Sequence, residues 1–311
     1  MNMNSPKISI ILPVFNAEKT INKSLDSIIE QTFKDFEIII VDDGSTDLSY
    51  QICDEYAEKD SRIHVIHKKN EGVAIARQIG IDNAKGEYSI HIDADDWIEP
   101  TMLEELYNTA KTQNSDIVIA DYFLNTNTSQ KICKQCPTSM TPQDILIDIF
   151  NNKLFGALWN KLIRTDLYKK YNARFFHNIN YCEDVLICAQ IMKHQEVKIT
   201  NIDKAFYHYY INQNSITHRI TRKTYESRKL YQQKLNEILT DKIYNKAKEV
   251  SSLNIFVEGF MNNCLSRQEI ISEFKKNEYA AFHYVKSPRW LIGYFLIKIR
   301  CYSIAHKFIR Y

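Results

Sequence analysis

The sequence predicts an α/β protein in which a mainly parallel sheet is flanked by helices and followed by a helical C-terminal extension. Apolar runs of strand length alternate with amphipathic segments through the first half of the 311-residue chain. Polar residues gather where those runs end, and from about Arg222 onward the hydrophobic spacing is helical. Apolar strands separated by helices are typical of a parallel sheet that is covered on both faces.

The first half is expected to hold five strands with helices between them. The first helix should begin behind Asn16 as its N-cap, because Ile21, Leu25 and Ile28 recur at helical spacing after it. The predicted strands are residues 7–15, 36–45, 62–68, 86–93 and 115–123. Ligands of such sheets bind outside the carboxyl ends of the strands, so the polar residues that follow these strands are the candidate site.

The pattern weakens between residues 125 and 139 and then resumes. A helix is predicted over residues 141–150, with Thr141 as its N-cap and Pro142 in its first turn. Two mixed segments and an aromatic strand complete this half of the chain, at residues 157–171, 180–194 and 204–212.

Composition sets broad limits on the protein. With 44% hydrophobic and 25% charged residues, the chain can form one main domain and a smaller extra piece. Its formal charge is +2, although residues 222–311 hold 17 Lys and Arg against 8 Asp and Glu. We expect no nucleic-acid partner. No apolar run reaches the roughly 18 residues of a membrane-spanning helix.

The seven cysteines are odd in number and lack a regular framework. Cys133 and Cys136 form a CxxC motif that has neither a second cysteine pair nor histidines at zinc-binding spacing. This usage is typical of a reducing compartment, so we expect the protein in the cytoplasm.

The sequence lacks the glycine-rich phosphate cradles of common nucleotide sites. Neither GxGxxG nor GxxxxGK[ST] occurs. A carboxylate cluster can serve phosphate in another way, by holding a hard divalent cation that bridges to the phosphate oxygens. Asp93, Asp95 and Asp96 form such a cluster after the fourth predicted strand. The alternative interpretation of these acids is a capped turn.

Three segments, in order and at fitting spacing, connect the chain to a known family. They are KISIILPVFNAEKTINKSLDSIIEQTFKDFEIIIVDDGSTD, NEGVAIARQIGIDNAKGEYSIHIDADDW and YCEDVLICAQI, within residues 6–215. These segments resemble the family 2 glycosyltransferases of the GT-A fold, which has a Rossmann-like sheet. The branch they resemble builds bacterial capsule, O-antigen and other cell-surface polysaccharides.

The resemblance also implies a domain organisation. A glycosyltransferase domain would cover residues 1–220, with the nucleotide-binding half at about 1–105 and the acceptor half at 106–220. The helical extension would then cover residues 221–311.

For the nucleotide base, the resemblance implies contacts from the ends of the first two strands. Pro13 and Val14 would line the base, and Glu18 would reach the sugar or base region. Asp43 would accept a hydrogen bond from the uracil imide, while Asp42 shapes the turn or shares that role. An Asx turn that ends the strand is the simpler interpretation of the two aspartates.

For the rest of the donor, the resemblance implies three further contacts. Arg77 would lie near the diphosphate or ribose, although alone it reads as a surface cation on a helix. Asp93 would bind the ribose hydroxyls, and Asp95 would bind the cation, Mn²⁺ or Mg²⁺, that bridges the diphosphate. Asp96 would be a second metal contact or a helix cap before Trp97.

The acid pair in YCEDV is the candidate for catalysis. Transfer of a glycosyl group to a hydroxyl requires a base that takes the hydroxyl proton, and attack opposite the leaving diphosphate inverts the anomeric centre. The resemblance assigns Asp184 as that base, with Glu183 beside it. Acids in a first helical turn, where negative charge is favoured, are the alternative interpretation.

Two segments resemble family features whose roles are less specific. Trp159, Asn160 and Lys161 would lie on the acceptor side, and core packing is the alternative for Trp159. His208 and Ser215 would contact the diphosphate from a segment that folds over the donor, unless it is an ordinary loop.

Residues 286–311 mix apolar and basic side chains and contain no Asp or Glu. A basic amphipathic segment with aromatic residues can lie in the interface of an anionic membrane, which would suit a lipid-linked acceptor on the inner face of the cell membrane. The alternatives are packing on the protein's own surface or on a second subunit of a homo-oligomer.

The function predicted from the sequence is an inverting, metal-dependent glycosyltransferase. It would move a sugar from a nucleotide sugar, most simply a UDP-sugar, to a saccharide or lipid-linked acceptor. One alternative is a catalytically inactive nucleotide-binding scaffold of the same fold. The other is a sugar nucleotidyltransferase, which would need a glycine-rich, basic loop after the first strand, whereas PVFNAEKT contains no glycine.

Overall fold

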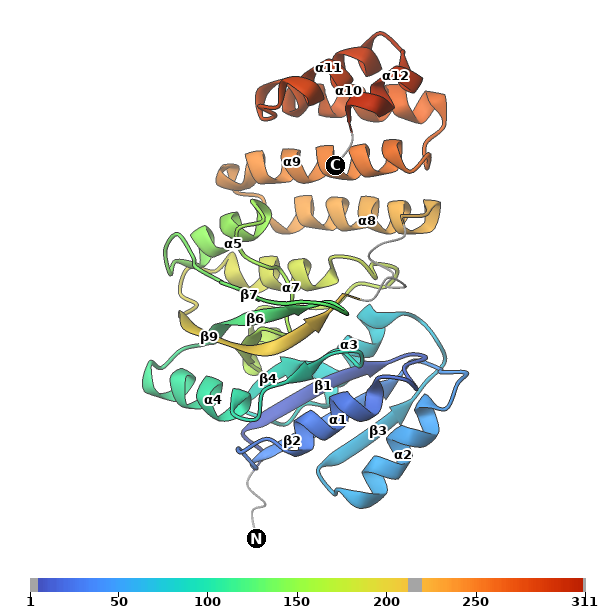
Figure 1. Cartoon of the computed structure of the whole chain (residues 1–311). Helices are drawn as coiled ribbons and strands as arrows, with labels where there is room; N and C mark the ends of the chain where they lie inside the picture. Colours follow the sequence, from blue (N-terminus) through green and yellow to red (C-terminus); the bar gives the residue numbers. More distant parts are fainter. Residues whose placement is uncertain (1–4, 212–219, 310–311) are drawn as a thin grey trace. The chain divides into compact units, whose positions relative to one another are not determined.

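The computed structural model describes residues 5–211 and 220–309 (Figure 1). The chain divides into two compact units, residues 1–213 and residues 214–311. Each unit has a hydrophobic core of its own.

The first unit is built from strands and helices in alternation. Its strands are β1 (Ile8–Val14), β2 (Phe36–Asp42), β3 (Ile63–His67), β4 (Tyr88–His91), β5 (Trp97–Ile98), β6 (Ile117–Asn125), β7 (Gln130–Cys133), β8 (Lys161–Arg164) and β9 (Ile199–Tyr210). Its helices are α1 (Ile21–Ile29), α2 (Ser49–Lys59), α3 (Val73–Asn83), α4 (Met102–Thr112), α5 (Pro142–Phe150), α6 (Asp166–Lys170) and α7 (Glu183–Met192).

These strands form one sheet in the order β3-β2-β1-β4-β8-β6-β9-β5, with β7 paired to β6. β1 to β4 are parallel to one another, and so are β6 and β9. β8 is antiparallel to both of its neighbours. The predicted α/β class, with a mainly parallel sheet between helices, is confirmed.

The parallel strands β1, β2 and β4 are buried along their whole length, as expected for strands that are covered on both faces. Because β1 to β4 run in one direction, their carboxyl ends share one edge of the sheet. Val14, Asp42, His67 and His91 end the four strands there.

Two predicted helix starts had different outcomes. Thr141 caps α5 as expected, because its side chain accepts a hydrogen bond from the backbone N–H of Asp144 and Pro142 occupies the first turn. The Asn16 cap was wrong, since α1 begins only at Ile21. Asn16 instead adopts a left-handed conformation with φ 51°, which asparagine tolerates, and its Oδ1 accepts from the Thr46 backbone N–H at 2.8 Å.

The second unit is helical, so the predicted helical extension is confirmed. Its helices are α8 (Arg222–Ile238), α9 (Asn245–Met261), α10 (Arg267–His283), α11 (Pro288–Lys298) and α12 (Tyr302–Phe308), with a 3₁₀ turn at Lys242–Tyr244. Helix α11 is apolar on two sides: Tyr294 and Ile297 are buried in the core, whereas Ile292, Phe295 and the C-cap residue Ile299 lie on the surface with 47–54% of each residue exposed. None of the described helices is both long and apolar enough to span a bilayer.

Candidate active site

A buried arginine on α3 joins the acids that follow β4 to the acids that begin α7. The Arg77 Nη2 donates to Asp93 Oδ1 at 2.7 Å, and Nη1 donates to Glu183 Oε1 at 2.9 Å and to Asp184. The Arg77 side chain is only 5% exposed. The structure therefore brings together four predicted site residues from three separate elements.

Charge and burial act in opposite directions within this cluster. Burial raises the pKa of Glu183 and of Asp184, while the guanidinium of Arg77 opposes both shifts. Although burial alone would lower the pKa of Arg77, the carboxylates of Asp184, Asp93 and Glu183 raise it well above its usual value. The guanidinium stays protonated, and a carboxylate with a raised pKa is a better proton acceptor than an exposed one.

Local backbone geometry presents the acid pair to the site. Cys182 has a left-handed conformation with φ 63°, so the chain turns sharply just before α7. Glu183 and Asp184 then occupy the first turn of that helix, where the helix dipole favours negative charge. The expected position of both acids in a first helical turn is confirmed, and this is compatible with a chemical role.

Asp95 has the surroundings of a cation ligand. Burial and the Asp93 carboxylate raise its pKa to about 6. Among residues 5–211 and 220–309, its own backbone is its only hydrogen-bond partner. A half-buried carboxylate without a positive partner suits Mg²⁺ or Mn²⁺, which proteins hold with one or two carboxylates plus phosphate oxygens and water.

Asp96 is engaged within the protein. Its residue is 1% exposed, and its carboxylate accepts from the Tyr207 hydroxyl and the Tyr210 backbone N–H, both at 2.8 Å. A helix cap before Trp97 is wrong, because Trp97 begins strand β5. In the described part of the chain, no three His, Cys, Asp or Glu side chains are grouped to hold a metal. Any cation here would have Asp95 as its main protein ligand.

The two aspartates at the carboxyl end of β2 are also held in place. Asp42 Oδ1 accepts from the Ser45 backbone N–H at 3.0 Å, three residues on and not the two of an Asx turn, and its Oδ2 lies 2.9 Å from Nδ1 of His67. Asp43 accepts from Lys68 Nζ at 2.7 Å. It also accepts from the backbone N–H groups of Glu71 and Gly72, at 2.9 and 2.7 Å. Since Gly72 is the N-cap of α3, Asp43 is tied to the helix that carries Arg77.

The remaining residues predicted for the base lie at the ends of neighbouring strands. Pro13 and Val14 are buried in β1, where they pair with Val41 and Asp42. Glu18 accepts from the Leu48 backbone N–H at 3.2 Å and so joins the loop after β1 to the loop after β2.

The segments predicted for the acceptor side are mostly internal. Trp159 is 3% exposed and stacks on Tyr207 with ring centroids 4.3 Å apart. Asn160 is fully buried and donates to the Ala120 carbonyl at 3.1 Å. Lys161 is 1% exposed. These three side chains pack inside the first unit.

His208 is also buried, and its Nε2 lies 2.7 Å from Glu99 Oε1. Its ring stacks between the rings of Trp97 and Phe123, with centroids 4.8 and 4.5 Å away. Ser215 lies outside the described residues.

Sequence reasoning missed two residues that organise the site. The Tyr207 hydroxyl accepts from the Asp93 backbone N–H at 3.1 Å while it donates to Asp96. The Asn180 side chain lies against Gly72 and accepts from the Ala74 backbone N–H at 3.2 Å. The alternating aromatic residues of the last strand were the only sequence signal for Tyr207, and none pointed to Asn180.

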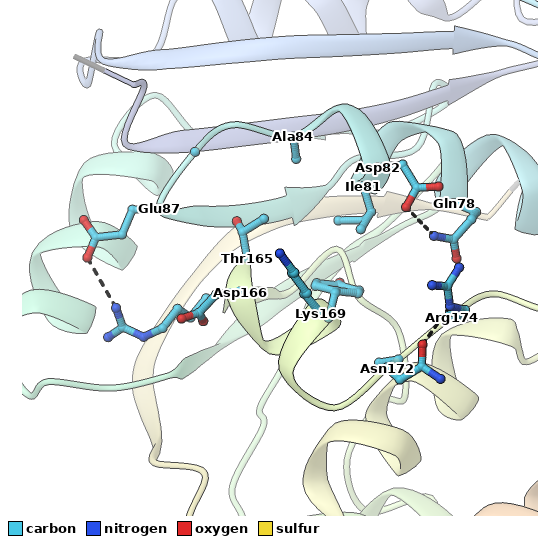
Figure 2. Close-up of a pocket in the computed structure, with 14 residues that line it drawn as sticks. Gln78, Ile81, Asp82, Ala84, Glu87, Thr165, Asp166, Lys169, Asn172 and Arg174 are labelled. Atoms are coloured by element: carbon cyan, nitrogen blue, oxygen red, sulfur yellow. Dashed lines mark hydrogen bonds and ion pairs between the residues drawn. The ribbon is translucent and has the colours of Figure 1, made fainter. Parts of the chain in front are cut away.

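A separate pocket of about 650 Å³ lies away from these acids (Figure 2). Gly86 and Glu87, which line it, precede β4, whereas Asp93 follows that strand. Glu87 is paired with Arg164, which also lines the pocket, and Figure 2 shows Lys169 from α6 among the lining side chains. The pocket thus lies at the opposite end of β4 from the acids and is not part of the candidate active site.

We expect Arg77→Met to destabilise the protein, because the change leaves three carboxylates without their cation. Removing one partner of a buried ion pair costs about 3–5 kcal/mol. In the variant the pKa values of Glu183 and Asp184 rise further above their unfolded values, so stability should increase as pH falls. Urea unfolding at pH 5.5 and pH 8 measures both effects. The control is Arg164→Met, which breaks a partly exposed ion pair and should lower the free energy of unfolding by less. An equal loss of unfolding free energy in both variants would contradict the expectation.

His67 should make a pH-dependent contribution to stability. The hydrogen bond to Asp42 raises its pKa, as does the one to Asp54, while burial opposes them. Because the pKa of His67 is higher in the folded than in the unfolded protein, its protonation stabilises the folded state. This stabilisation is complete below the unfolded pKa of about 6.5 and is lost as the pH rises through the folded pKa. His67→Gln should therefore lower the melting temperature more at pH 5.5 than at pH 8.5. The exposed His177→Gln is the control, and an equal loss at both pH values would refute the expectation.

The sequence is similar to known proteins over most of its first unit. The sequence pattern of Glycosyl transferase family 2 matches residues 9–171, just over half of the chain. A cholesterol galactosyltransferase of Borreliella burgdorferi is 38% identical over 214 residues, 65% of this chain and 59% of that protein. A putative glycosyltransferase of Bacillus subtilis, EpsH, is 34% identical over 231 residues, 72% of this chain and 67% of that protein. The chain therefore spans less than two thirds of the Borreliella protein.

Solved structures share the fold. Residues 1–349 of S. aureus TarS, crystallised in complex with UDP-GlcNAc, match with a TM-score of 0.73 at 20% identity, over 97% of this chain and 90% of that one. At this identity the likeness establishes the GT-A-like fold alone. With the family pattern over residues 9–171, it confirms the resemblance seen in the sequence. The chain belongs to glycosyltransferase family 2.

Proposed function

We propose that this protein is an inverting, metal-dependent glycosyltransferase that moves a sugar from a UDP-sugar to a hydroxyl group of a saccharide or lipid-linked acceptor. Its family membership supports a nucleotide-sugar donor, and TarS has been solved with UDP-GlcNAc and with UDP. The sequence branch that it resembles suggests bacterial surface polysaccharide synthesis. One observation carries the proposal: Arg77 holds the donor-side Asp93 and the acid pair Glu183 and Asp184 on a single guanidinium.

In the proposed reaction, Asp184 is the general base. The acceptor oxygen attacks the anomeric carbon while the bond from that carbon to the UDP oxygen breaks, and the hydroxyl proton passes to the Asp184 carboxylate. Attack from the face opposite the departing UDP inverts the anomeric centre. Glu183 and Arg77 orient the base, and Asp93 holds the ribose hydroxyls of the donor.

A divalent cation, Mn²⁺ or Mg²⁺, is the proposed cofactor, with Asp95 as its protein ligand. When bound, it supplies Lewis-acid stabilisation of the charge that develops on the diphosphate. The Asp95 carboxylate supports this assignment, because within the described residues its own backbone is its only hydrogen-bond partner. Asp96 acts through Tyr207 and the backbone of β9, which fix the turn that presents Asp95.

Asp184→Asn tests the base. This nearly isosteric change should reduce sugar transfer at least about 1,000-fold, because the amide cannot accept the proton, while the affinity for UDP stays close to that of the unmodified protein. Radiolabelled transfer measures the first effect, and calorimetry with UDP, with and without Mn²⁺, measures the second.

The control is Asp166→Asn, which removes the charge of an exposed aspartate on α6. Full transfer by Asp184→Asn would contradict the base assignment. Absence of metal-dependent UDP binding by the unmodified protein would favour the inactive scaffold. Release of pyrophosphate from UTP and a sugar phosphate would favour the nucleotidyltransferase.

The proposed location is the cytoplasmic face of the cell membrane. Ile292 and Phe295 on α11 and Ile299 at its C-cap are exposed apolar residues, and residues 286–309 contain basic side chains but no acids. Exposed apolar residues in a basic segment without acids suit the interface of an anionic bilayer, where each basic residue near the surface contributes about 1 kcal/mol. This location would bring the protein to a lipid-linked acceptor.

Phe295→Ser should weaken binding of the full chain to phosphatidylglycerol vesicles, because it removes the most exposed of the three apolar residues. Flotation with vesicles of phosphatidylglycerol and of phosphatidylcholine measures both the loss and the charge dependence. Ile271→Ser, at an exposed isoleucine of α10, is the matched control. Equal binding by the two variants would contradict the membrane assignment, and a concentration-dependent dimer that Phe295→Ser disrupts would indicate a subunit interface.

A further inference from the structure

We propose that Lys161 is a positioning residue for Asp184: its buried ammonium holds residues 155–158, the segment that packs against the start of α7 and so sets the position of Asp184. This inference rests on the proposed role of Asp184 as the base. It gives Lys161 a role inside the protein in place of a contact with the acceptor.

The Lys161 ammonium uses all three of its donors within the chain. Nζ donates to the Phe155 carbonyl at 2.8 Å, to the Ala157 carbonyl at 2.6 Å and to Asn160 Oδ1 at 2.8 Å. None of these partners is a carboxylate. Burial of an ammonium group without a hydrogen-bonded acid costs desolvation free energy. A lysine at the start of β8 therefore indicates a role other than filling the core.

The two carbonyls belong to the short segment that leads into β8. The backbone N–H of Lys161 donates to the Leu158 carbonyl at 3.0 Å, so Lys161 is hydrogen-bonded to this segment through both its side chain and its backbone. The Leu158 backbone is near enough to the Asp184 carboxylate to help lower its pKa. Arg77 donates directly to this carboxylate.

The same segment packs directly on the first turns of α7. A Cβ added to Gly156 would lie 2.6 Å from Val185 Cγ2, so only glycine allows this close approach. One turn further along the helix, the Cys188 Sγ donates to the Gly156 carbonyl at 3.7 Å. The segment between Phe155 and Leu158 therefore sets the position of the acid pair through contacts with Val185 and Cys188, which follow Asp184 on α7.

Lys161 also interacts electrostatically with the site. Burial lowers the pKa of Lys161, whereas the nearby Cys188 thiol and Asp184 carboxylate oppose this shift. The ammonium is thus close enough to act on Asp184 electrostatically without contacting it. This arrangement favours the ionised base while its oxygens remain free of a direct lysine ion pair.

Lys161→Met tests the proposal, since methionine keeps most of the side-chain length and removes all three donors. Misplacement of a reacting group by about 1 Å can cost about 100-fold in rate, so kcat should fall about 10- to 100-fold. The KM for the UDP-sugar and the affinity for UDP should change less than about threefold, because the donor contacts are separate. Arg164→Met at the other end of β8 is the control, and it should lower the melting temperature with little effect on kcat.

A second pair of variants keeps the test decisive if Lys161→Met does not fold. Gly156→Ala should push the segment away from α7 and lower kcat selectively. Adding Val185→Ala removes the methyl group that the new Cβ meets, so the double variant should recover most of the lost kcat. Recovery supports positioning by this segment, because a loss of general stability would not be repaired by a second truncation.

Two results would overturn the inference, and they can be told apart. If Asp184→Asn abolishes transfer but Lys161→Met and Gly156→Ala keep kcat within about twofold of the unmodified protein, Lys161 is structural only. If Asp184→Asn transfers sugar normally, the base assignment itself fails, and the role of Lys161 fails with it.

Discussion

The first unit depends on one buried ion cluster, in which the Arg77 guanidinium is surrounded by Asp93, Glu183 and Asp184. Burial of each charged side chain in this cluster depends on the opposite charges beside it. An unpaired guanidinium could not be buried at this depth, and three carboxylates this close would repel one another without a cation between them. The cluster also joins α3, the turn after β4 and the start of α7, so the charges that serve chemistry also hold three elements together.

The parallel part of the sheet could be predicted because β1, β2 and β4 are apolar on both faces, and this property is local in the sequence. The site was harder to predict. The acids of α7 lie 106 and 107 residues after Arg77, so no spacing rule relates them. From the sequence alone, Arg77 is predicted to be an ordinary surface cation on a helix. The prediction of Asn16 as an N-cap was wrong for a related reason. Its side chain binds Thr46, 30 residues away, and this tertiary contact takes the place of a local capping hydrogen bond.

Asp95 and Asp96 show how neighbours from elsewhere in the chain separate residues that are alike in sequence. Both follow β4 and both carry a carboxylate. Asp96 meets the Tyr207 hydroxyl and the Tyr210 backbone on β9, more than 100 residues downstream, while Asp95 meets neither. The contacts with β9 thus decide which acid is bound inside the protein and which keeps its oxygens available. The sequence shows the cluster of acids, but only the sheet pairing distinguishes its members.

Two buried cations of different chemistry flank Asp184, and the difference follows from their geometry. Arg77 is a planar fork with several donors, which suits simultaneous contact with three carboxylates. Lys161 is a compact ammonium whose three donors are filled by two carbonyls and one amide, so its charge remains uncancelled by a bonded acid. A base in a buried site must remain ionised, yet a second direct ion pair would hold its lone pairs more tightly and lower its basicity. A lysine that acts through the backbone of residues 155–158 supplies positive potential without occupying the carboxylate, which reconciles burial of Asp184 with its availability to a proton.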